Sequence, residues 1–178
     1  MLDKRYQVFI STSGKDMQPE RMVLSQTLVG MGFFSWGLEQ RTPLSTAFSR
    51  RQIDDCDYFL LLLGSQYGEQ SVSGVGYMHL EYIYAVTKQK PIIVFMHEDP
   101  TSRTESLQDE KPELKEKFLE FRKQLQQEVD QVISYRTLRD LELAVRSNML
   151  QMLERYPVVG WVRPQNMQLL QDEIDSLK

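Results

Sequence analysis

The feature that most constrains the fold is the run Tyr58–Leu63 (YFLLLL), in which every side chain is apolar or aromatic. A strand with one solvated face would alternate apolar and polar residues, so this run indicates a strand that is covered on both faces. Such strands lie at the centre of parallel sheets with helices packed on either side. The run is far too short to cross a bilayer, which takes about 20 residues.

Shorter apolar runs predict the other strands of this sheet, and apolar residues at helical spacing predict helices between them. We expect strands at Tyr6–Ser11, Phe33–Leu38, Pro91–Met96 and, at an edge, Val132–Tyr135, with helices at Asp16–Met31, Ala47–Asp55, Tyr77–Lys88, Pro112–Gln131 and Thr137–Arg155. Repeated strand–helix–strand units imply right-handed crossovers and a parallel sheet. The predicted fold class is therefore α/β: a flavodoxin-like three-layer sandwich with a central parallel sheet of four to five strands.

The length of 178 residues is typical of one domain with a short appendage. We expect the domain to span residues 1–156, followed by a tail, residues 157–178, that carries a short helix. Residues 99–111 are polar and rich in turn formers, which predicts a mobile surface loop within the domain.

Composition excludes several classes of function. A formal net charge of −4 and a pI near 5.3 argue against a broad nucleic-acid-binding face. There is no apolar signal core and no membrane-spanning run, and the single cysteine, Cys56, fits a reducing compartment. With two histidines and no convincing ligand set, we expect no metal and no bound cofactor, and we expect the protein to be cytoplasmic.

In a flavodoxin-like sheet, ligands bind in the crevice between the carboxyl ends of strands one and three. Both predicted loops at that crevice have unusual composition. Ser11, Ser13 and Asp16 follow the first strand, and four glycines, Gly68 among them, lie within residues 64–76 after the third. Glycines let the backbone approach a ligand closely. For the two serines and Asp16, a turn that caps the first helix is an equally good interpretation.

Glu81 is the strongest candidate for a functional residue, because no Lys or Arg stands three or four positions from it on its helix. The usual explanation of a helical glutamate, a local ion pair, therefore does not apply. A carboxylate that faces the crevice could oppose a positively charged, oxocarbenium-like sugar carbon, as cleavage of a glycosidic bond requires. The alternative is a solvated or capping glutamate.

Three further residues are weaker candidates for ligand contact. Glu39, at the end of strand two, could reach a ribose hydroxyl, although exposure on the surface is the plainer interpretation. Tyr67 and Tyr77 could line a pocket, whereas tyrosines in such positions more often serve in packing.

The chain resembles the DUF4062 family in three ordered blocks of sequence: 6–21 (YQVFISTSGKDMQPER), 53–69 (IDDCDYFLLLLGSQYGE) and 73–95 (SGVGYMHLEYIYAVTKQKPIIVF). That family is similar to Toll/interleukin-1 receptor (TIR) domains and, more distantly, to nucleoside deoxyribosyltransferases. The resemblance implies that Glu81 is the catalytic glutamate. It also implies substrate-binding roles for Ser11, Ser13, Asp16 and the pair Tyr67–Gly68.

The resemblance further implies an N-glycosidase that cleaves the nicotinamide–ribose bond of NAD or a related nucleotide, acting in bacterial defence against phage. NAD would be a substrate rather than a cofactor, and a second copy or an effector protein would be the partner. The alternative is a non-catalytic module that binds a nucleotide signal or a protein. The family commonly has an aromatic residue where this chain has Gly14 and an arginine where it has Gln66, and these differences favour the module.

Overall fold

The computed structural model describes residues 3–164 and 167–177 and contains one five-stranded sheet in which all neighbouring strands are parallel. The strand order is β2-β1-β3-β4-β5, which confirms the predicted flavodoxin-like arrangement. The strands are β1 (Tyr6–Thr12), β2 (Phe33–Trp36), β3 (Tyr58–Leu63), β4 (Ile92–His97) and β5 (Gln131–Tyr135).

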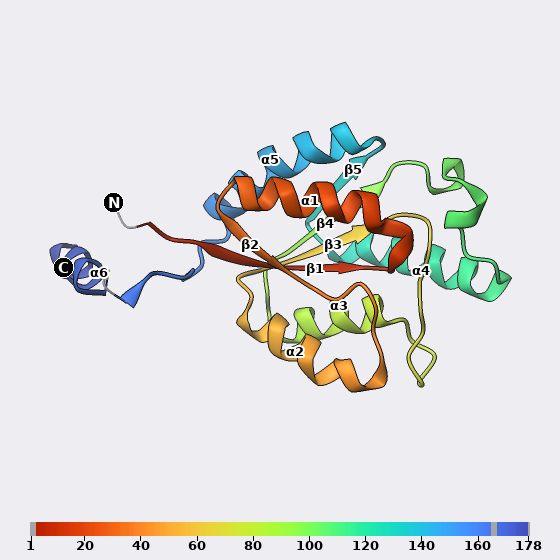
Figure 1. The fold of residues 1–178 in the computed structure, drawn as a ribbon, viewed down its shortest axis with the longest axis horizontal. Helices are drawn as coiled ribbons and strands as arrows, with labels where there is room; N and C mark the ends of the chain where they lie inside the picture. The colour runs from red at the N-terminus through yellow and green to blue at the C-terminus, as the bar shows by residue number, and fades with distance from the viewer. Residues whose placement is uncertain (1–2, 165–166, 178) are drawn as a thin grey trace.

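Helices cover both faces of the sheet and make the outer layers of a three-layer sandwich (Figure 1). One face is covered by α1 (Gln18–Gly30) and α5 (Leu138–Arg155), and the other by α2 (Thr46–Asp55), α3 (Tyr77–Thr87) and α4 (Pro112–Glu128). The connections between neighbouring parallel strands run through these helices, as the sequence pattern predicts.

The central strand β3 explains why its sequence is apolar throughout. Its six residues are all buried, and they point alternately into two separate hydrophobic cores. Leu60 and Leu62 pack under α1 and α5, whereas Leu61 and Leu63 pack under α2, α3 and α4. A polar residue at any of these positions would lose its hydration without gaining a partner.

Most element boundaries lie within three residues of the prediction, and the differences have local causes. The first helix begins with a separate 3₁₀ turn, Lys15–Met17, before α1. The strand β2 ends at Trp36 instead of Leu38 because Gly37 adopts a φ of 150°, which takes the chain out of the sheet. A capping box begins α5, with Thr137 and Asp140 each accepting a hydrogen bond from the other's backbone N–H.

The predicted loop, residues 99–111, folds into two 3₁₀ turns, Pro100–Ser102 and Glu105–Leu107. Two of its polar side chains reach inward. The side chain of Arg103 is 6% exposed and donates a hydrogen bond to Ser65, and Asp109 accepts a hydrogen bond from the backbone N–H of Tyr67. Ser65 and Gln66 also donate to backbone carbonyls of the loop, so the loop is attached to the segment after β3 by several hydrogen bonds, while its mobility stays a prediction.

The tail leaves the domain at an isolated bridge between Arg5 and Trp161 and carries the helix α6 (Met167–Ser176), which lies beyond the end of the sheet near the N-terminus (Figure 1). None of the helices within residues 3–164 and 167–177 combines the length and the hydropathy needed to cross a membrane.

The two cores predict where truncation of a leucine is costly. Leu61→Ala, at a fully buried position of β3, should lower the free energy of unfolding by about 2–5 kcal/mol, because it removes contacts that the core cannot restore. The same change at Leu119, which is 63% exposed, should cost far less. Urea denaturation of both variants checks this, and equal losses would contradict the assignment of Leu61 to the core.

Candidate functional site

A cleft of about 730 Å³ opens at the carboxyl ends of β1 and β3, where the topology predicts a ligand site. This volume is in the range of small-molecule and cofactor sites. Four of the predicted site residues line it: Ser13, Asp16, Glu39 and Gly68. The turn at Ser106 and Leu107 contributes another part of the wall, so the loop after β4 helps to shape the cleft.

Gly68 brings the first and third loops into contact. Its φ is +85°, and a Cβ atom at this position would lie 2.5 Å from the carbonyl oxygen of Ser13. Any other residue would push the two loops apart or strain the backbone. The role of this glycine is therefore close approach of one loop to the other on the floor of the cleft.

Glu81 is buried, with 6% of its surface exposed, although it lies on a helix that covers the sheet. The hydroxyl of Ser11 donates a 2.7 Å hydrogen bond to its Oε1. Arg41 donates twice, from Nη2 to Oε1 at 2.7 Å and from Nε to Oε2 at 3.2 Å. The interpretation of Glu81 as a solvated glutamate is therefore wrong, and two residues predicted separately, Ser11 and Glu81, are in direct contact.

The ion pair with Arg41 is what sequence reasoning missed. Helical spacing excludes a local partner for Glu81, but the partner comes from 40 residues earlier in the chain, on the connection between β2 and the next helix. No periodicity marks Arg41, and its charge resembles that of any surface arginine. Only the packing of that connection over α3 makes it a buried cation, with 4% of its side chain exposed.

Arg41 and Glu81 also line a second, much smaller cavity of about 30 Å³ between α2 and α3. Tyr77 and Ser49 contribute to its walls. This space is enough for a water molecule but not for a sugar. Arg41 lines both this cavity and the large cleft, whereas the residues that line the cleft do not include Glu81.

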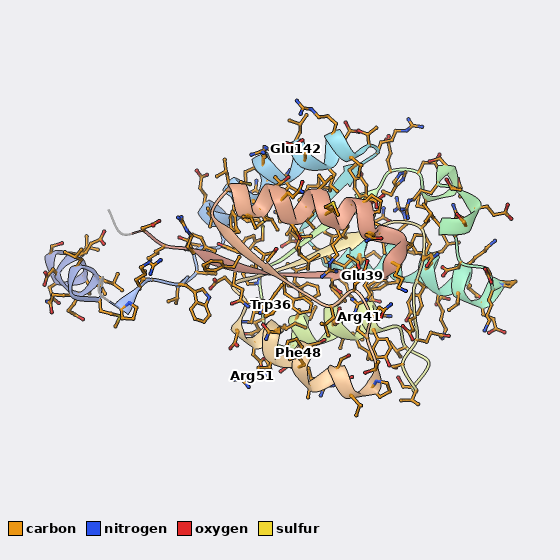
Figure 2. All side chains as sticks on the ribbon, viewed as in Figure 1. Trp36, Glu39, Arg41, Phe48, Arg51 and Glu142 are labelled. Atoms are coloured by element: carbon orange, nitrogen blue, oxygen red, sulfur yellow. The ribbon has the colours of Figure 1, made fainter. Side chains whose placement is uncertain are left out.

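Two more charged residues, Glu39 and Arg21, form one cluster with the Arg41–Glu81 pair. Glu39 and Arg41, both labelled in Figure 2, line the same cleft, and Oε1 of Glu39 is buried without a hydrogen-bond partner. Arg21 approaches Thr12 from α1, at 3.5 Å. Burial, followed by repulsion from Arg41, lowers the pKa of Arg21, while Glu39 and Glu81 oppose this shift. The cluster thus contains two arginines and two glutamates, of which Arg41 and Glu81 form an ion pair.

A separate polar cluster surrounds Asp16. Its carboxylate accepts hydrogen bonds from Ser13 Oγ at 2.8 Å to each oxygen and lies 3.8 Å from Arg103. The side chain of Ser13 therefore bonds to Asp16 and does not cap the first helix, so the capping interpretation is wrong for Ser13. Burial is the largest influence on Asp16 and raises the pKa of its carboxyl to about 6, although Ser13 and Arg103 counteract it.

The two candidate tyrosines, Tyr67 and Tyr77, are not among the residues that line the cleft. Tyr67 is 3% exposed and packs edge-on against Phe121 and His79, while its hydroxyl accepts a hydrogen bond from the backbone N–H of Gly76. These contacts give Tyr67 a packing role. Tyr77 lines the small cavity rather than the cleft.

Within residues 3–164 and 167–177, no group of three or more histidine, cysteine, aspartate or glutamate side chains is arranged to hold a metal ion. Cys56 is buried, and burial raises the pKa of its thiol to about 12, so it is not a nucleophile at neutral pH. The polar side chains that line the cleft carry carboxylates, hydroxyls, amides and the two cationic groups of Lys15 and Arg41.

Comparison with known proteins agrees with this geometry at the level of family and fold. A profile described as "Domain of unknown function (DUF4062)" matches residues 7–150. The chain belongs to the DUF4062 family. This confirms the family resemblance of the three sequence blocks. No curated protein is similar enough in sequence to match.

Among solved structures, the DUF4062 chain is similar to the CMP N-glycosidase of Clostridium botulinum, with a TM-score of 0.52 and 16% sequence identity. The alignment covers 82% of this chain and 98% of the glycosidase. At this identity the likeness establishes a shared fold.

The raised pKa of Asp16 predicts a pH dependence of stability. An acid whose pKa is higher in the folded state binds more protons when folded, so its contribution to stability is present below the unfolded pKa of 3.8 and is lost as the pH rises through about 6. Asp16→Asn, which mimics the protonated acid, should therefore raise the free energy of unfolding more at pH 7.5 than at pH 4, by up to about 3 kcal/mol.

Urea denaturation at the two pH values measures this difference. Glu116→Gln, at an exposed position on α4, controls for the change in net charge. A stability difference between wild type and Asp16→Asn that does not change with pH would contradict the assignment.

Proposed function

We propose that the protein is an N-glycosidase that cleaves the bond between the base and the ribose of NAD or a related nucleotide. The observation that carries this proposal is the buried carboxylate of Glu81, held by Ser11 at the tip of β1, beside a cleft of a size suited to a nucleotide. The fold shared with a CMP N-glycosidase supports the same class of reaction.

The chemistry requires negative charge where positive charge develops. As the glycosidic bond breaks, the anomeric carbon and ring oxygen of the sugar become positive, and a fixed carboxylate stabilises that charge better in a water-poor site than in water. Glu81 has this role in the proposal. Ser11 orients the carboxylate by donating to Oε1, while Arg41 donates to both oxygens.

Residues lining the cleft would position the substrate. Glu39 has a buried oxygen without a partner, and a ribose hydroxyl is a donor that would satisfy it. Ser13 and Asp16 line the same cleft and are assigned to contacts with the sugar or phosphate, with Gly68 as the floor. Nicotinamide leaves NAD as a neutral molecule, so this reaction needs neither a strong general acid nor a metal.

The biological setting belongs to the same proposal. Hydrolysis of NAD in a bacterial cell would deplete it or would release an ADP-ribose signal, and either outcome would serve defence against phage. Assembly of several copies, or an effector protein, would supply the trigger for such a reaction.

A second candidate is a module that binds a nucleotide without cleaving it. The specific observation in its favour is that Arg41 pairs with both carboxylate oxygens of Glu81. A buried ion pair of this kind also occurs where both charges serve only the architecture. Binding of NAD or CMP without any release of base by the wild-type protein would favour this module.

The proposal predicts that Glu81→Gln abolishes release of the base. The amide keeps the shape but loses the negative charge, so the rate should fall by at least about 100-fold, in line with the loss of one electrostatic contribution to a transition state. Incubation with NAD and with CMP, followed by mass spectrometry of the products, measures this. Glu69→Gln removes an exposed carboxylate from the same cleft and should retain most of the activity.

A milder variant tests the same site in case Glu81→Gln does not fold. Ser11→Ala removes one hydrogen bond to Glu81 but keeps the ion pair, and thermal unfolding shows whether the protein stays folded. Its rate should fall less than that of Glu81→Gln. Release of base at the wild-type rate by folded Glu81→Gln would refute the proposed mechanism.

A further inference from the structure

We propose that Arg41 is the anion-binding residue of the cleft, and that a phosphate group of the ligand frees Glu81 by drawing Arg41 away from it. The first part, binding of the anion by Arg41, does not depend on any reaction. The second half rests on the function proposed above, because it matters only if Glu81 acts on a sugar.

Glu81 is not among the residues that line the cleft in which a ligand fits. Its carboxylate lines a cavity of about 30 Å³, whereas the space for a ligand is the cleft of about 730 Å³. Arg41 lines both spaces and is bonded to both carboxylate oxygens of Glu81. Of the two residues of this ion pair, Arg41 is therefore the one that a ligand in the cleft would contact.

This arrangement is unproductive for cleavage of a glycosidic bond. A guanidinium beside the sugar would repel the positive charge that develops on the anomeric carbon, and the same guanidinium cancels the charge of Glu81. The arginine must withdraw from Glu81 before the carboxylate can act. Since both side chains are almost fully buried, water does not compete strongly for them, and the pair holds until a stronger partner arrives.

A phosphate is such a partner. The planar fork of a guanidinium binds phosphate and carboxylate in the same two-point geometry, so a phosphate oxygen pair can take the place of Oε1 and Oε2 of Glu81. Among the described residues that line the cleft, the cations are Lys15 and Arg41. Lys15 is exposed and carries a point charge, whereas Arg41 already holds its donors in the two-point arrangement. An uncharged nucleoside has no group that can compete for them.

The chain around Arg41 permits this movement. Arg41 lies on the connection 37–42 between β2 and a 3₁₀ turn at Pro43–Ser45. The next residue, Thr42, is held by mutual hydrogen bonds with Ser45, so the side chain of Arg41 can turn toward the cleft while its backbone stays in place. Arg21 is a second cation of the same cluster and continues to compensate Glu81 and Glu39 when Arg41 leaves.

The experiment is calorimetric titration of the full chain with CMP, NAD and cytidine. In Glu81→Gln the amide no longer holds Arg41, so the binding-competent state is populated in advance, and CMP and NAD should bind at least about tenfold more tightly than to wild type. The affinity for cytidine should not change. In Arg41→Gln, CMP and cytidine should bind with affinities within about threefold of each other, since the group that recognises phosphate is gone.

Two further variants act as controls. Lys15→Gln removes the other cation of the cleft and should keep the preference for CMP over cytidine. The double variant Glu81→Gln with Arg41→Gln removes both charges of the ion pair together, so neither is left without the other. It should therefore stay folded even where a single variant does not, and it should lack the preference for CMP. Thermal unfolding checks each variant.

Three results would overturn the proposal: equal affinity of wild type and folded Glu81→Gln for CMP and NAD, a retained preference for CMP in the folded Arg41 variants, or no binding of either nucleotide to any variant. These titrations need no turnover. If they give the expected result while wild type releases no base, the proposed function fails and the anion site stands. If base is released but the affinities do not change, the proposed function stands and the proposed anion site fails.

Discussion

Parallel pairing of β1 with β3 is the constraint on which the rest of the structure depends. The register sets Thr12 beside Leu62, so the loops that follow the two strands emerge at the same edge of the sheet. All six side chains of β3 pack in the two hydrophobic cores. Polar side chains therefore gather at the carboxyl ends of the strands. The cleft, the Ser11–Glu81 contact and the close approach of Gly68 to Ser13 all follow from this pairing.

Burial of charge determines how the site is organised. A carboxylate removed from water must be paired or protonated, and the protein uses both solutions a short distance apart. Glu81 is paired with Arg41 and Ser11, whereas burial raises the pKa of Asp16 to about 6 in spite of Ser13 and Arg103. One carboxylate is therefore held in an ion pair, whereas the other has a raised pKa.

The same ion pair accounts for both candidate functions. The pair engages both oxygens of Glu81, as a purely structural pair would, and a phosphate that draws Arg41 away would free the same carboxylate to act on a sugar. A protein that must not hydrolyse free nucleosides gains from such coupling, because only a ligand that carries the anion removes the block. The attachment of residues 99–111 through Arg103 and Asp109 fits this picture, since it fixes a wall of the cleft instead of leaving it open.

The sequence by itself determined the fold class, because the doubly apolar run Tyr58–Leu63 and the alternating strands and helices leave few other ways to bury the chain. It also indicated the edge of the sheet where Ser13, Asp16, Glu39 and Gly68 meet, since topology alone places those loops together. It did not reveal Arg41, whose importance comes from contact across 40 residues. The tertiary structure decided that partnership, and with it the separation of Glu81 from the cleft, because the pairing of buried charges depends on which distant segments pack together and leaves no periodic trace in the sequence.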